Sequence, residues 1–360
     1  MGDFFMKKIK ASTFDIAGVY IGTVIGAGFA SGQEIMKFFT SYGYKGIYGI
    51  LLSGVLFSIL GWGILEMGYV YKIRDYRGFI YFMMGDFLGN IMEWIVSLFM
   101  FISFCTMLAG AGALFKQQFQ WPAIVGILIM AALCFLVFLY DIKGIIVINS
   151  ILVPFLFIGG IYLGIHSIIY KDTAVFSSIL MGSFHFFTNN WLSSSLVYVS
   201  YNILTAAVIL SSLFPAIKSV KEAKRGGILG GAALTLLGLS VVIATLIYYD
   251  KIEGLEIPIL GIVVNYGQHI EYIFLLVLIA AIFTTAVANG YGFLTRFCDE
   301  FDLTYKSVIP YFMLTSVLVA LIGFSTMVTK LYSFFGYIGI FELFIILIYF
   351  IHYKINKKRI

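Results

Sequence analysis

The chain has 360 residues, of which 61% are hydrophobic and only 11% are charged, whereas about 25% of the residues in an ordinary soluble domain are charged. So few charges cannot cover the surface of a soluble protein, and the composition indicates a polytopic membrane protein. The formal net charge is +5, but no soluble domain is left over to carry a basic face, which excludes a nucleic-acid partner.

Apolar segments recur along the whole chain, and about 20 helical residues are enough to cross the hydrocarbon core of a bilayer. They predict an all-α integral membrane protein with ten transmembrane helices in a single domain over residues 1–360. The predicted helices span residues 14–40, 46–71, 89–115, 121–140, 144–169, 191–215, 227–249, 258–294, 307–326 and 332–353. The eighth is too long for one straight crossing, so we expect it to include an interfacial stretch around residues 258–268.

Lys and Arg residues indicate the orientation, because cytoplasmic loops carry an excess of them. With ten crossings both termini lie on one side, and that side holds 17 of the 23 Lys and Arg residues. We therefore expect both termini in the cytoplasm and residues 171–190 in an extracellular loop. Cys105, Cys134 and Cys298 show no CxxC spacing, so they indicate neither a disulfide framework nor a zinc site.

The chain repeats itself at a constant offset of 178 residues. Val19-Tyr20 matches Val197-Tyr198, and Gly49-Ile50-Leu51 matches Gly227-Ile228-Leu229. A third pair of helices shares Glu93, Ile95, Leu98, Thr106, Gly112 and Phe115 with Glu271, Ile273, Leu276, Thr284, Gly290 and Phe293. We expect two copies of five helices, over about residues 14–170 and 191–353. Because five is odd, the second copy enters the membrane from the opposite face, and such inverted repeats are typical of secondary transporters.

The first predicted helix contains the stretch GTVIGAGFASGQE at residues 22–34. Glycine destabilises a helix interior by about 1 kcal/mol relative to alanine, so Gly26-Ala27-Gly28 predicts a break in mid-membrane. The backbone groups freed by the break need partners, and the N–H groups of Ala27 and Gly28 would suit a carboxylate. The repeat places Tyr198–Asn202 at the matching depth, so we expect the sixth helix to be discontinuous as well. Small-residue helix packing is the alternative explanation of these glycines.

Three motifs carry a family resemblance: GTVIGAGFASGQEI in helix 1, YVSYN in helix 6 and IFTTAVANG in helix 8. The chain resembles the YkvI-type bacterial membrane proteins, which are grouped with amino acid permeases in the amino acid, polyamine and organocation superfamily of LeuT-type fold. The resemblance implies a multi-pass protein of the bacterial plasma membrane. It further implies secondary active transport by alternating access, as Na⁺-coupled symport of an amino acid or a similar small solute with carboxylate or amine groups.

The resemblance also implies a sodium site between helices 1 and 8, with Na⁺ as the coupling ion and no other cofactor. Na⁺ would be bound by the carbonyls of Gly22, Ile25 and Ala281 and by the hydroxyls of Thr284 and Thr285. Positions i, i+3 and i+4 share one helix face, so the spacing on helix 8 is compatible with one ion. In the alternative explanation, the two hydroxyls bond only to preceding carbonyls of their own helix.

The resemblance places the substrate pocket around the break in helix 1. There the Ala27 and Gly28 amides would receive an acidic group, and carbonyls of a broken helix 6 would receive an amine. The substrate-binding candidates are Thr23, Gly26, Ala27, Gly28, Ser103, Thr106, Tyr198, Ser200, Tyr201 and Asn202. Because aromatic residues make up 18% of the chain, a single tyrosine can equally be a packing residue.

Proton coupling is the nearest alternative to sodium. Glu34 is an acidic residue inside a membrane segment and therefore a candidate proton carrier or gating residue, unless Lys37, three residues further on, neutralises it. Asp15 and Glu66 lie near predicted helix ends, where solvation or packing explains them. The predicted fifth helix lacks the Lys that replaces the ion in some relatives.

Other functional classes have less support. The sequence contains no HExxH and no Gly-x-Ser-x-Gly motif, so we expect no enzyme. A channel or receptor on the same scaffold is an alternative. Metal transport has little support, because no Asp occupies the helix 1 break and no Met-x-His interrupts helix 6. The expected partners are a small solute and membrane lipids; the sequence does not determine an oligomeric state.

Overall fold

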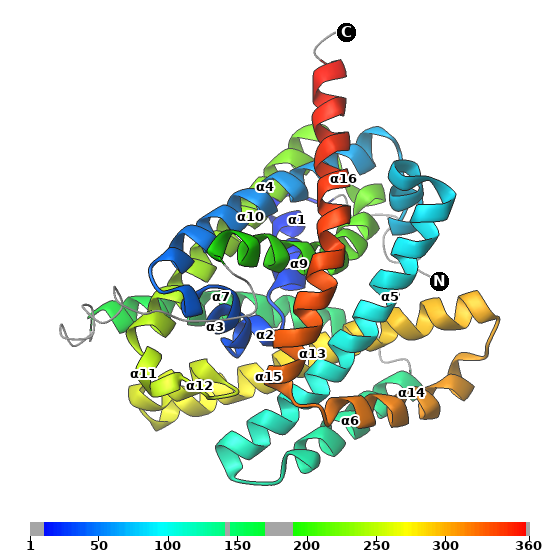
Figure 1. Ribbon diagram of the computed structural model, residues 1–360. Helices are drawn as coiled ribbons and strands as arrows, with labels where there is room; N and C mark the ends of the chain where they lie inside the picture. The colour runs from blue at the N-terminus through cyan, green and yellow to red at the C-terminus, as the bar shows by residue number, and fades with distance from the viewer. Residues whose placement is uncertain (1–10, 141–144, 170–189, 358–360) are drawn as a thin grey trace.

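The computed structural model describes residues 11–140, 145–169 and 190–357 (Figure 1). The predicted extracellular loop at residues 171–190 lies almost wholly outside this part of the chain. Seven described helices are long and apolar enough to cross a membrane. Three shorter apolar helices, Thr13–Val24, Val153–Ile169 and Tyr305–Ala320, fall on the remaining predicted crossings. The all-α membrane architecture predicted from the sequence is therefore confirmed.

The first predicted helix is divided into three parts. α1 (Thr13–Val24) begins at a Ser12 cap, which Asp15 completes by accepting a hydrogen bond from the Ser12 amide. α2 (Ala27–Ala30) is a single turn, and α3 (Gln33–Phe38) follows after Gly32, whose φ is +83°. The predicted break is confirmed, and Asp15 has the helix-end role expected of it.

The other helices follow in chain order. They are α4 (Lys45–Val70), α5 (Tyr76–Phe119), α6 (Ala123–Tyr140), α7 (Ile145–Ile169), α9 (Trp191–Ser212), α10 (Val220–Ile247), α11 (Tyr249–Ile252), α12 (Pro258–Val263), α13 (Gln268–Phe301), α14 (Tyr305–Ala320), α15 (Phe324–Thr326) and α16 (Ser333–Lys357). Short turns lie between some of them, at η2 (Thr40–Tyr42), η3 (Phe214–Ala216), η4 (Val264–Tyr266) and the π-helical η5 (Met327–Tyr332). The separation of α12 and η4 from α13 confirms that the eighth segment is more than one straight helix.

The predicted discontinuity of the sixth helix is wrong. α9 runs without a break from Trp191 to Ser212 and contains no glycine. Its polar side chains bond to carbonyls of their own helix: Ser200 to Leu196 at 2.6 Å, Asn202 to Tyr198 at 2.9 Å and Thr205 to Asn202 at 3.1 Å. Serine, threonine and asparagine inside a helix are satisfied in this way, so their presence did not require a break.

The third helix is longer than predicted. α5 extends back to Tyr76 and bends sharply at Gly85, which has φ of 71° and ψ of −179°. Glycine permits this conformation because it has no Cβ. The part before Gly85 carries Tyr76 and Arg77, and the sequence did not predict it as helical.

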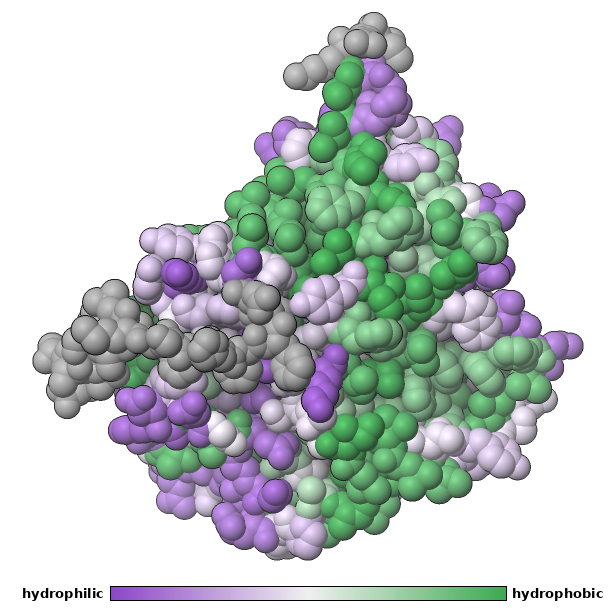
Figure 2. All heavy atoms as spheres, viewed as in Figure 1, coloured by the Kyte–Doolittle hydropathy of each residue, from purple (hydrophilic) through white to green (hydrophobic). Residues whose placement is uncertain are grey.

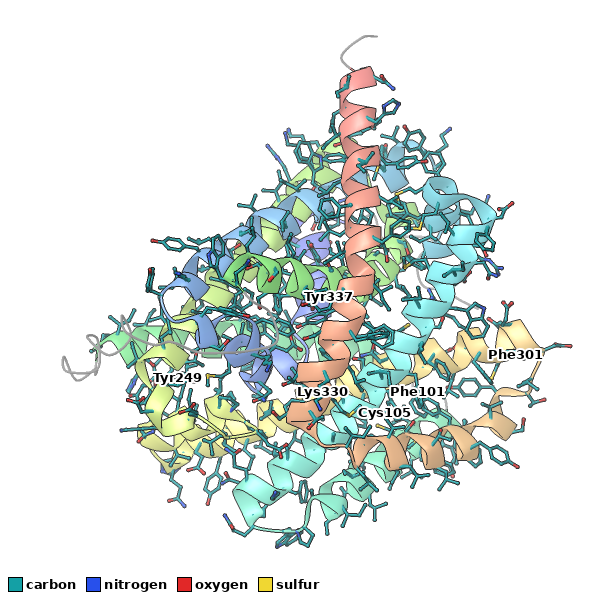
Figure 3. All side chains as sticks on the ribbon, in the orientation of Figure 1. Phe101, Cys105, Tyr249, Phe301, Lys330 and Tyr337 are labelled. Carbon is teal, nitrogen blue, oxygen red and sulfur yellow. The ribbon has the colours of Figure 1, made fainter. Side chains whose placement is uncertain are left out.

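The helices form two groups in space. α1, α4, α9 and α10 pack together in the upper left of Figure 1, whereas α6, α13 and α14 pack together below them, with α5 against α6 and α13. Figure 2 shows apolar side chains covering a broad part of the visible face. α16 contributes exposed Phe334, Phe341, Phe344, Ile348 and Ile351 to the surface, as expected for a helix that contacts lipid. The three cysteines are buried free thiols, and Figure 3 shows Cys105 in α5.

α4 and α10, which are the second helices of the two predicted repeats, approach each other through glycines. A Cβ added to Gly231 would lie 2.3 Å from the Ser58 amide nitrogen, and one added to Gly227 would lie 2.4 Å from that of Trp62. These neighbours are backbone atoms, which cannot rotate away. Small residues at such a crossing allow two helices in a membrane to pack closely.

Gly231→Ala is therefore expected to force α4 and α10 apart and to lower the free energy of unfolding by about 1–3 kcal/mol. The measurement is the melting temperature of the purified protein in detergent. Gly159→Ala is the matched control, because no atom lies within 4 Å of the Cβ it would add. Equal melting temperatures for the two variants would show that the glycine contact does not limit the packing of this pair.

Glu66 of α4 is completely buried and is bound by the last helix. Lys354 of α16 places its Nζ 2.6 Å from Glu66 Oε1, and the Tyr353 hydroxyl donates to the same oxygen at 3.0 Å. Lys354 also lies 4.5 Å from the centre of the Trp62 ring. Of the two explanations offered for Glu66, packing near the helix end is confirmed and solvation is wrong.

Lys354→Met is expected to destabilise the protein by about 1.5–3 kcal/mol, because it removes a charged hydrogen-bond donor from the buried Glu66 carboxylate. Thermal unfolding in detergent measures the loss. The double variant Glu66→Gln with Lys354→Met removes both charges and should recover much of the stability. A single variant as stable as the double one would contradict the assigned ion pair.

Candidate functional site

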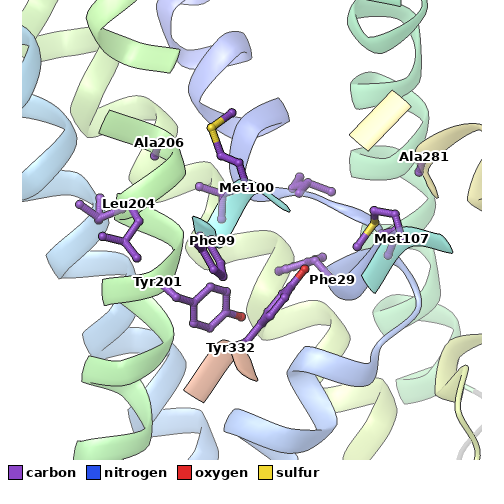
Figure 4. Close-up of a cluster of buried hydrophobic side chains, with 14 of the residues drawn as sticks. Phe29, Phe99, Met100, Met107, Tyr201, Leu204, Ala206, Ala281 and Tyr332 are labelled. Carbon is purple, nitrogen blue, oxygen red and sulfur yellow. The ribbon is translucent and has the colours of Figure 1, made fainter. Parts of the chain in front are cut away.

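Side chains from four segments meet beside the break in helix 1. We call this the central cluster: Gly28, Glu34, Phe38, Phe99, Ser103, Tyr198, Tyr201 and Tyr332. α2 and α3, α5, α9 and η5 each contribute, and none of the side chains is more than 6% exposed. Figure 4 shows Phe99, Tyr201 and Tyr332 gathered beside Phe29. The structure thus brings together five residues predicted as site residues from helices 1, 3 and 6.

Glu34 is the charged residue of the central cluster and is 4% exposed. The Tyr201 hydroxyl donates to Glu34 Oε2 at 2.8 Å. The other oxygen, Oε1, lies over Gly28, where an added Cβ would be only 1.9 Å away. The carboxylate of α3 therefore folds back over the first turn after the break, into space that a side chain at position 28 would fill.

Lys37 does not neutralise Glu34. The two ion pairs found among the described residues join Arg77 to Glu93 and Lys354 to Glu66. Lys37 lies one turn after Glu34 on α3, but it is not within ion-pair distance of the carboxylate. The neutralisation suggested by their spacing in the sequence is wrong.

Tyr332 and Phe99 were not singled out from the sequence. Tyr332 lies in the π-helical turn η5, and its hydroxyl is 3.2 Å from Ser103 Oγ. The Tyr332 ring lies 5.1 Å from that of Tyr201 and 5.3 Å from that of Phe99. In a chain with 24 tyrosines and 36 phenylalanines, no local signal distinguishes these two residues; the contact across helices reveals them.

Among the other predicted substrate residues, Thr106 borders the central cluster, whereas Ser200, Thr23 and Asn202 bond within their own helices. The Ser200 hydroxyl bonds within α9, and its carbonyl packs against Gly339 of α16, 3.0 Å from where a Cβ would stand. Thr23 bonds to the Val19 carbonyl of its own helix at 2.8 Å. Thr106 bonds to the Ile102 carbonyl at 2.8 Å and also lies against the Tyr332 hydroxyl. Asn202 is held by Tyr198 of α9 in the same manner. These side chains are occupied by helix carbonyls.

The break also meets α13, where the sodium site is predicted. The Gly26 amide donates to the Val24 carbonyl at 2.9 Å and not to Gly22, as it would in a regular helix. A Cβ added to Gly26 would lie 3.5 Å from Thr285 Cγ2 and 3.9 Å from Thr285 Oγ1. The chain thus approaches Thr285 at the point where the helix opens.

Thr284, the second hydroxyl of the predicted ion site, is 2% exposed and donates to the Ala281 carbonyl at 3.3 Å. This bond still leaves the oxygen lone pairs of Thr284 available to a cation. Ala281 is itself buried on α13. The geometry is compatible with an ion at this position. It is equally compatible with the alternative explanation, in which the two hydroxyls bond only within α13.

Segments far apart in the chain meet near the end of α2. The Ile259 amide of α12 donates to the Ser31 carbonyl at 3.0 Å, and Gln117 of α5 bonds to both the amide and the carbonyl of Ile257 at 3.1 Å. On another side, an apolar cavity of about 290 Å³ reaches Ile25 and Phe29 from between α7, α10 and α13. Backbone groups next to the break thus find protein partners, which such groups require in a membrane, while Gly26 itself stays partly exposed.

A second buried acid, Glu342 of α16, was also missed by sequence reasoning. The Tyr76 hydroxyl donates to Glu342 Oε1 at 3.4 Å, and the Arg296 guanidinium lies 5.2 Å from the centre of the Tyr76 ring. Glu342 is a single acidic residue within a strongly apolar predicted helix, and it was not singled out from the sequence. It lies away from the central cluster and provides a comparison for Glu34.

Sequence comparison decides the family. Uncharacterized membrane protein YkvI of Bacillus subtilis (strain 168) is 30% identical over 338 residues, which cover 93% of this chain and 95% of that protein. The chain belongs to the YkvI family. A further relative, uncharacterized protein YyaD of the same organism, is 26% identical over 332 residues and covers 91% of this chain and 94% of its own. No family model matches. The resemblance to YkvI-type proteins is thereby confirmed.

Solved structures show the fold of this YkvI family member. Mhp1 in its inward-facing conformation superposes with a TM-score of 0.61 at 16% identity, covering 91% of this chain and 73% of its own. A Na⁺-coupled sialic acid symporter in a substrate-bound outward-open state gives 0.60 at 13% identity, covering 94% and 77%. A mutant manganese transporter of Eremococcus coleocola gives 0.57 at 17% identity, covering 89% and 71%. These similarities confirm the LeuT-type fold of the chain.

Proposed function

We propose that the chain is a secondary active transporter that carries an amino acid or a related small solute across the membrane by alternating access, in symport with Na⁺. The observation that carries this proposal is the opening of helix 1 at Gly26, directly against Thr285 of α13. On one side of that opening lies the predicted ion site, and on the other lies the central cluster. One break would thus bring the proposed cation site and the proposed solute site next to each other.

The packing supports a mechanism in which one group of helices rocks against another. Tyr20 of α1 is enclosed between Gly61 of α4 and Gly230 of α10, where added Cβ atoms would lie 2.4 and 2.6 Å from its ring. The Tyr20 hydroxyl also donates to the Phe57 carbonyl at 2.8 Å. α1, α4 and α10 are thereby tied into one body, which with α9 would move against α5, α6, α13 and α14.

Sodium bound between Gly26 and Thr285 would join these two bodies. An ion can shift the equilibrium between conformations only by binding one of them more tightly. Ligands contributed by both bodies would provide that difference, because the proposed ion site would be complete only where helix 1 and α13 approach each other. Sodium would therefore favour the conformation in which the solute enters from outside.

Proton coupling is the second candidate, and the position of Glu34 favours it. A buried carboxylate that accepts one hydrogen bond from Tyr201 is suited to carry a proton across the membrane. Manganese transport, named for one structural neighbour, is not proposed for this chain. Among the described residues no group of three or more His, Cys, Asp or Glu side chains could hold a metal ion.

Uptake by purified protein in liposomes tests the proposal. A panel of radiolabelled amino acids is offered with an inward Na⁺ gradient, with an inward H⁺ gradient and with neither. We expect saturable accumulation of at least one amino acid above the external concentration under the Na⁺ gradient. Accumulation driven only by H⁺ would support the second candidate. Movement that stops at equal concentrations would instead indicate a channel.

A further inference from the structure

The Glu34 carboxylate needs either a positively charged partner or a proton of its own, because an isolated carboxylate in a membrane interior is strongly destabilised. Its hydrogen bond from Tyr201 does not neutralise the charge. None of the ion pairs of the described residues reaches Glu34. Within the described ranges, the protein thus places an acidic group at its centre with no lysine, arginine or histidine in ion-pair distance.

The surroundings of Glu34 suit an organic cation better than a metal ion. The Tyr201 ring has its centre 5.4 Å from that of Phe38, 5.5 Å from that of Tyr198 and 5.1 Å from that of Tyr332. Hard cations such as Na⁺ prefer oxygen-rich sites. Aromatic rings, in contrast, attract ammonium groups through the negative charge of their faces, and more strongly where water is excluded.

The continuity of α9 removes the acceptor otherwise expected for an amine. Carbonyls of a broken sixth helix were predicted to receive it, but α9 is unbroken. The Tyr198 and Leu196 carbonyls additionally accept bonds from the side chains of Asn202 and Ser200. The amine of a solute in the central cluster would therefore find its acceptor on α3.

The position of Glu34 also changes what we expect for the carboxylate of a solute, which was predicted to bind the Ala27 and Gly28 amides. The Ala27 and Gly28 amides begin a helix of only one turn, and the Glu34 carboxylate already lies over Gly28. A second carboxylate at the same place would meet a like charge. Recognition of a solute here would therefore depend on its positive end.

We propose that Glu34 binds the ammonium group of the transported solute, within a cage formed by Phe38, Phe99, Tyr198, Tyr201 and Tyr332. The solute class is then a primary amine, in which a carboxylate is dispensable. This inference rests on the proposed transport function and specifies which part of the solute is recognised.

The test measures binding to the full chain in lipid nanodiscs by thermal shift. The probes are the common amino acids, each with its decarboxylated amine and its N-acetyl derivative. For every amino acid that raises the melting temperature, the decarboxylated amine should also raise it. The N-acetyl derivative, which keeps the carboxylate and loses the charge on nitrogen, should not. Equal shifts by the N-acetyl derivatives would overturn the proposal, as would the absence of any shift by every amine tested.

Substitutions of the two buried glutamates test whether amine binding depends on Glu34. Glu34→Gln keeps the shape of the side chain and removes its charge, and it should weaken binding of the same amines by about 30-fold or more. Glu342→Gln is the matched control, since Glu342 is equally buried and also accepts from one tyrosine; it should leave the amine series unchanged. Unchanged amine affinity in folded Glu34→Gln would overturn the proposal. Should that variant fail to fold, the series of amines and N-acetyl derivatives on the unaltered chain still decides.

Transport in liposomes separates this inference from the proposed function. Accumulation of a solute that lacks an amine, with no effect of Glu34→Gln, would overturn the amine proposal while leaving the transporter in place. Binding of amines to Glu34 without movement of any of them across the membrane would contradict the transport function and leave the amine site in place.

Discussion

Uptake driven by a sodium gradient is expected to be lost in the double variant Thr284→Ala with Thr285→Ala. The two hydroxyls would supply two of the five oxygens around the ion, and a contact of this kind to a charged group contributes about 1.5–3 kcal/mol. Losing both should weaken Na⁺ binding by about 100-fold or more. The measurement is the Na⁺ dependence of the initial uptake rate in liposomes. Folding should be unaffected, since alanine is favourable inside a helix.

α14 offers a matched control for this pair. Thr315 and Ser316 are adjacent hydroxyl residues whose side chains both donate to the Phe312 carbonyl, at 2.9 and 2.7 Å. The double variant Thr315→Ala with Ser316→Ala removes the same groups from a helix that the break does not touch, and Na⁺-driven uptake should persist. Full sodium-driven uptake in the Thr284 and Thr285 variant would show that these hydroxyls bond only within α13, as the 3.3 Å contact from Thr284 to Ala281 also permits.

Gly28→Ala is expected to abolish uptake while leaving the fold intact. The new methyl group would occupy the position that Glu34 Oε1 now holds, 1.9 Å away. Because the atoms it displaces are the end of a flexible side chain, the carboxylate moves and the helices do not. Glu34 would lose its bond to Tyr201, and with it the geometry of the central cluster. Uptake in liposomes and the melting temperature in detergent measure the two effects separately.

Gly18→Ala on α1 is the control for this substitution. No atom lies within 4 Å of the Cβ that it would add, so it should transport normally and unfold at an equal or slightly higher temperature. Normal uptake by Gly28→Ala would mean that the position of the Glu34 carboxylate is not required. A large fall in melting temperature would mean that Gly28 has a packing role.

The sequence predicted the features that depend on composition and on local backbone preference. Long apolar segments gave the ten crossings because the bilayer demands uninterrupted hydrogen bonding and apolar side chains over a fixed length. The break at Gly26 was predicted because two glycines weaken the helix wherever it is placed. The split of the eighth segment followed from its length. The limits of the two repeats and the residues of the sodium site stay predictions.

Polar side chains within a helix were less informative, because their effect depends on whether they bond locally. Ser200 and Asn202 suggested a break, yet each bonds to a carbonyl one turn earlier in α9. Serine and asparagine beside an actual helix break would give the same sequence pattern. The geometry of the helix, and not its composition, distinguishes the two cases.

Tertiary structure alone decided which groups share the centre of the protein. Glu34 and Tyr201 are 167 positions apart and bond at 2.8 Å, while Tyr332 enters from the last helix through a π-helical turn. Glu34 and Lys37 are close in sequence, yet they form no ion pair. The local sequence determines where each helix begins, breaks and ends, because helix boundaries depend on residues that are neighbours in the chain. Which side chains meet depends on how the helices pack against one another, and no local pattern records that.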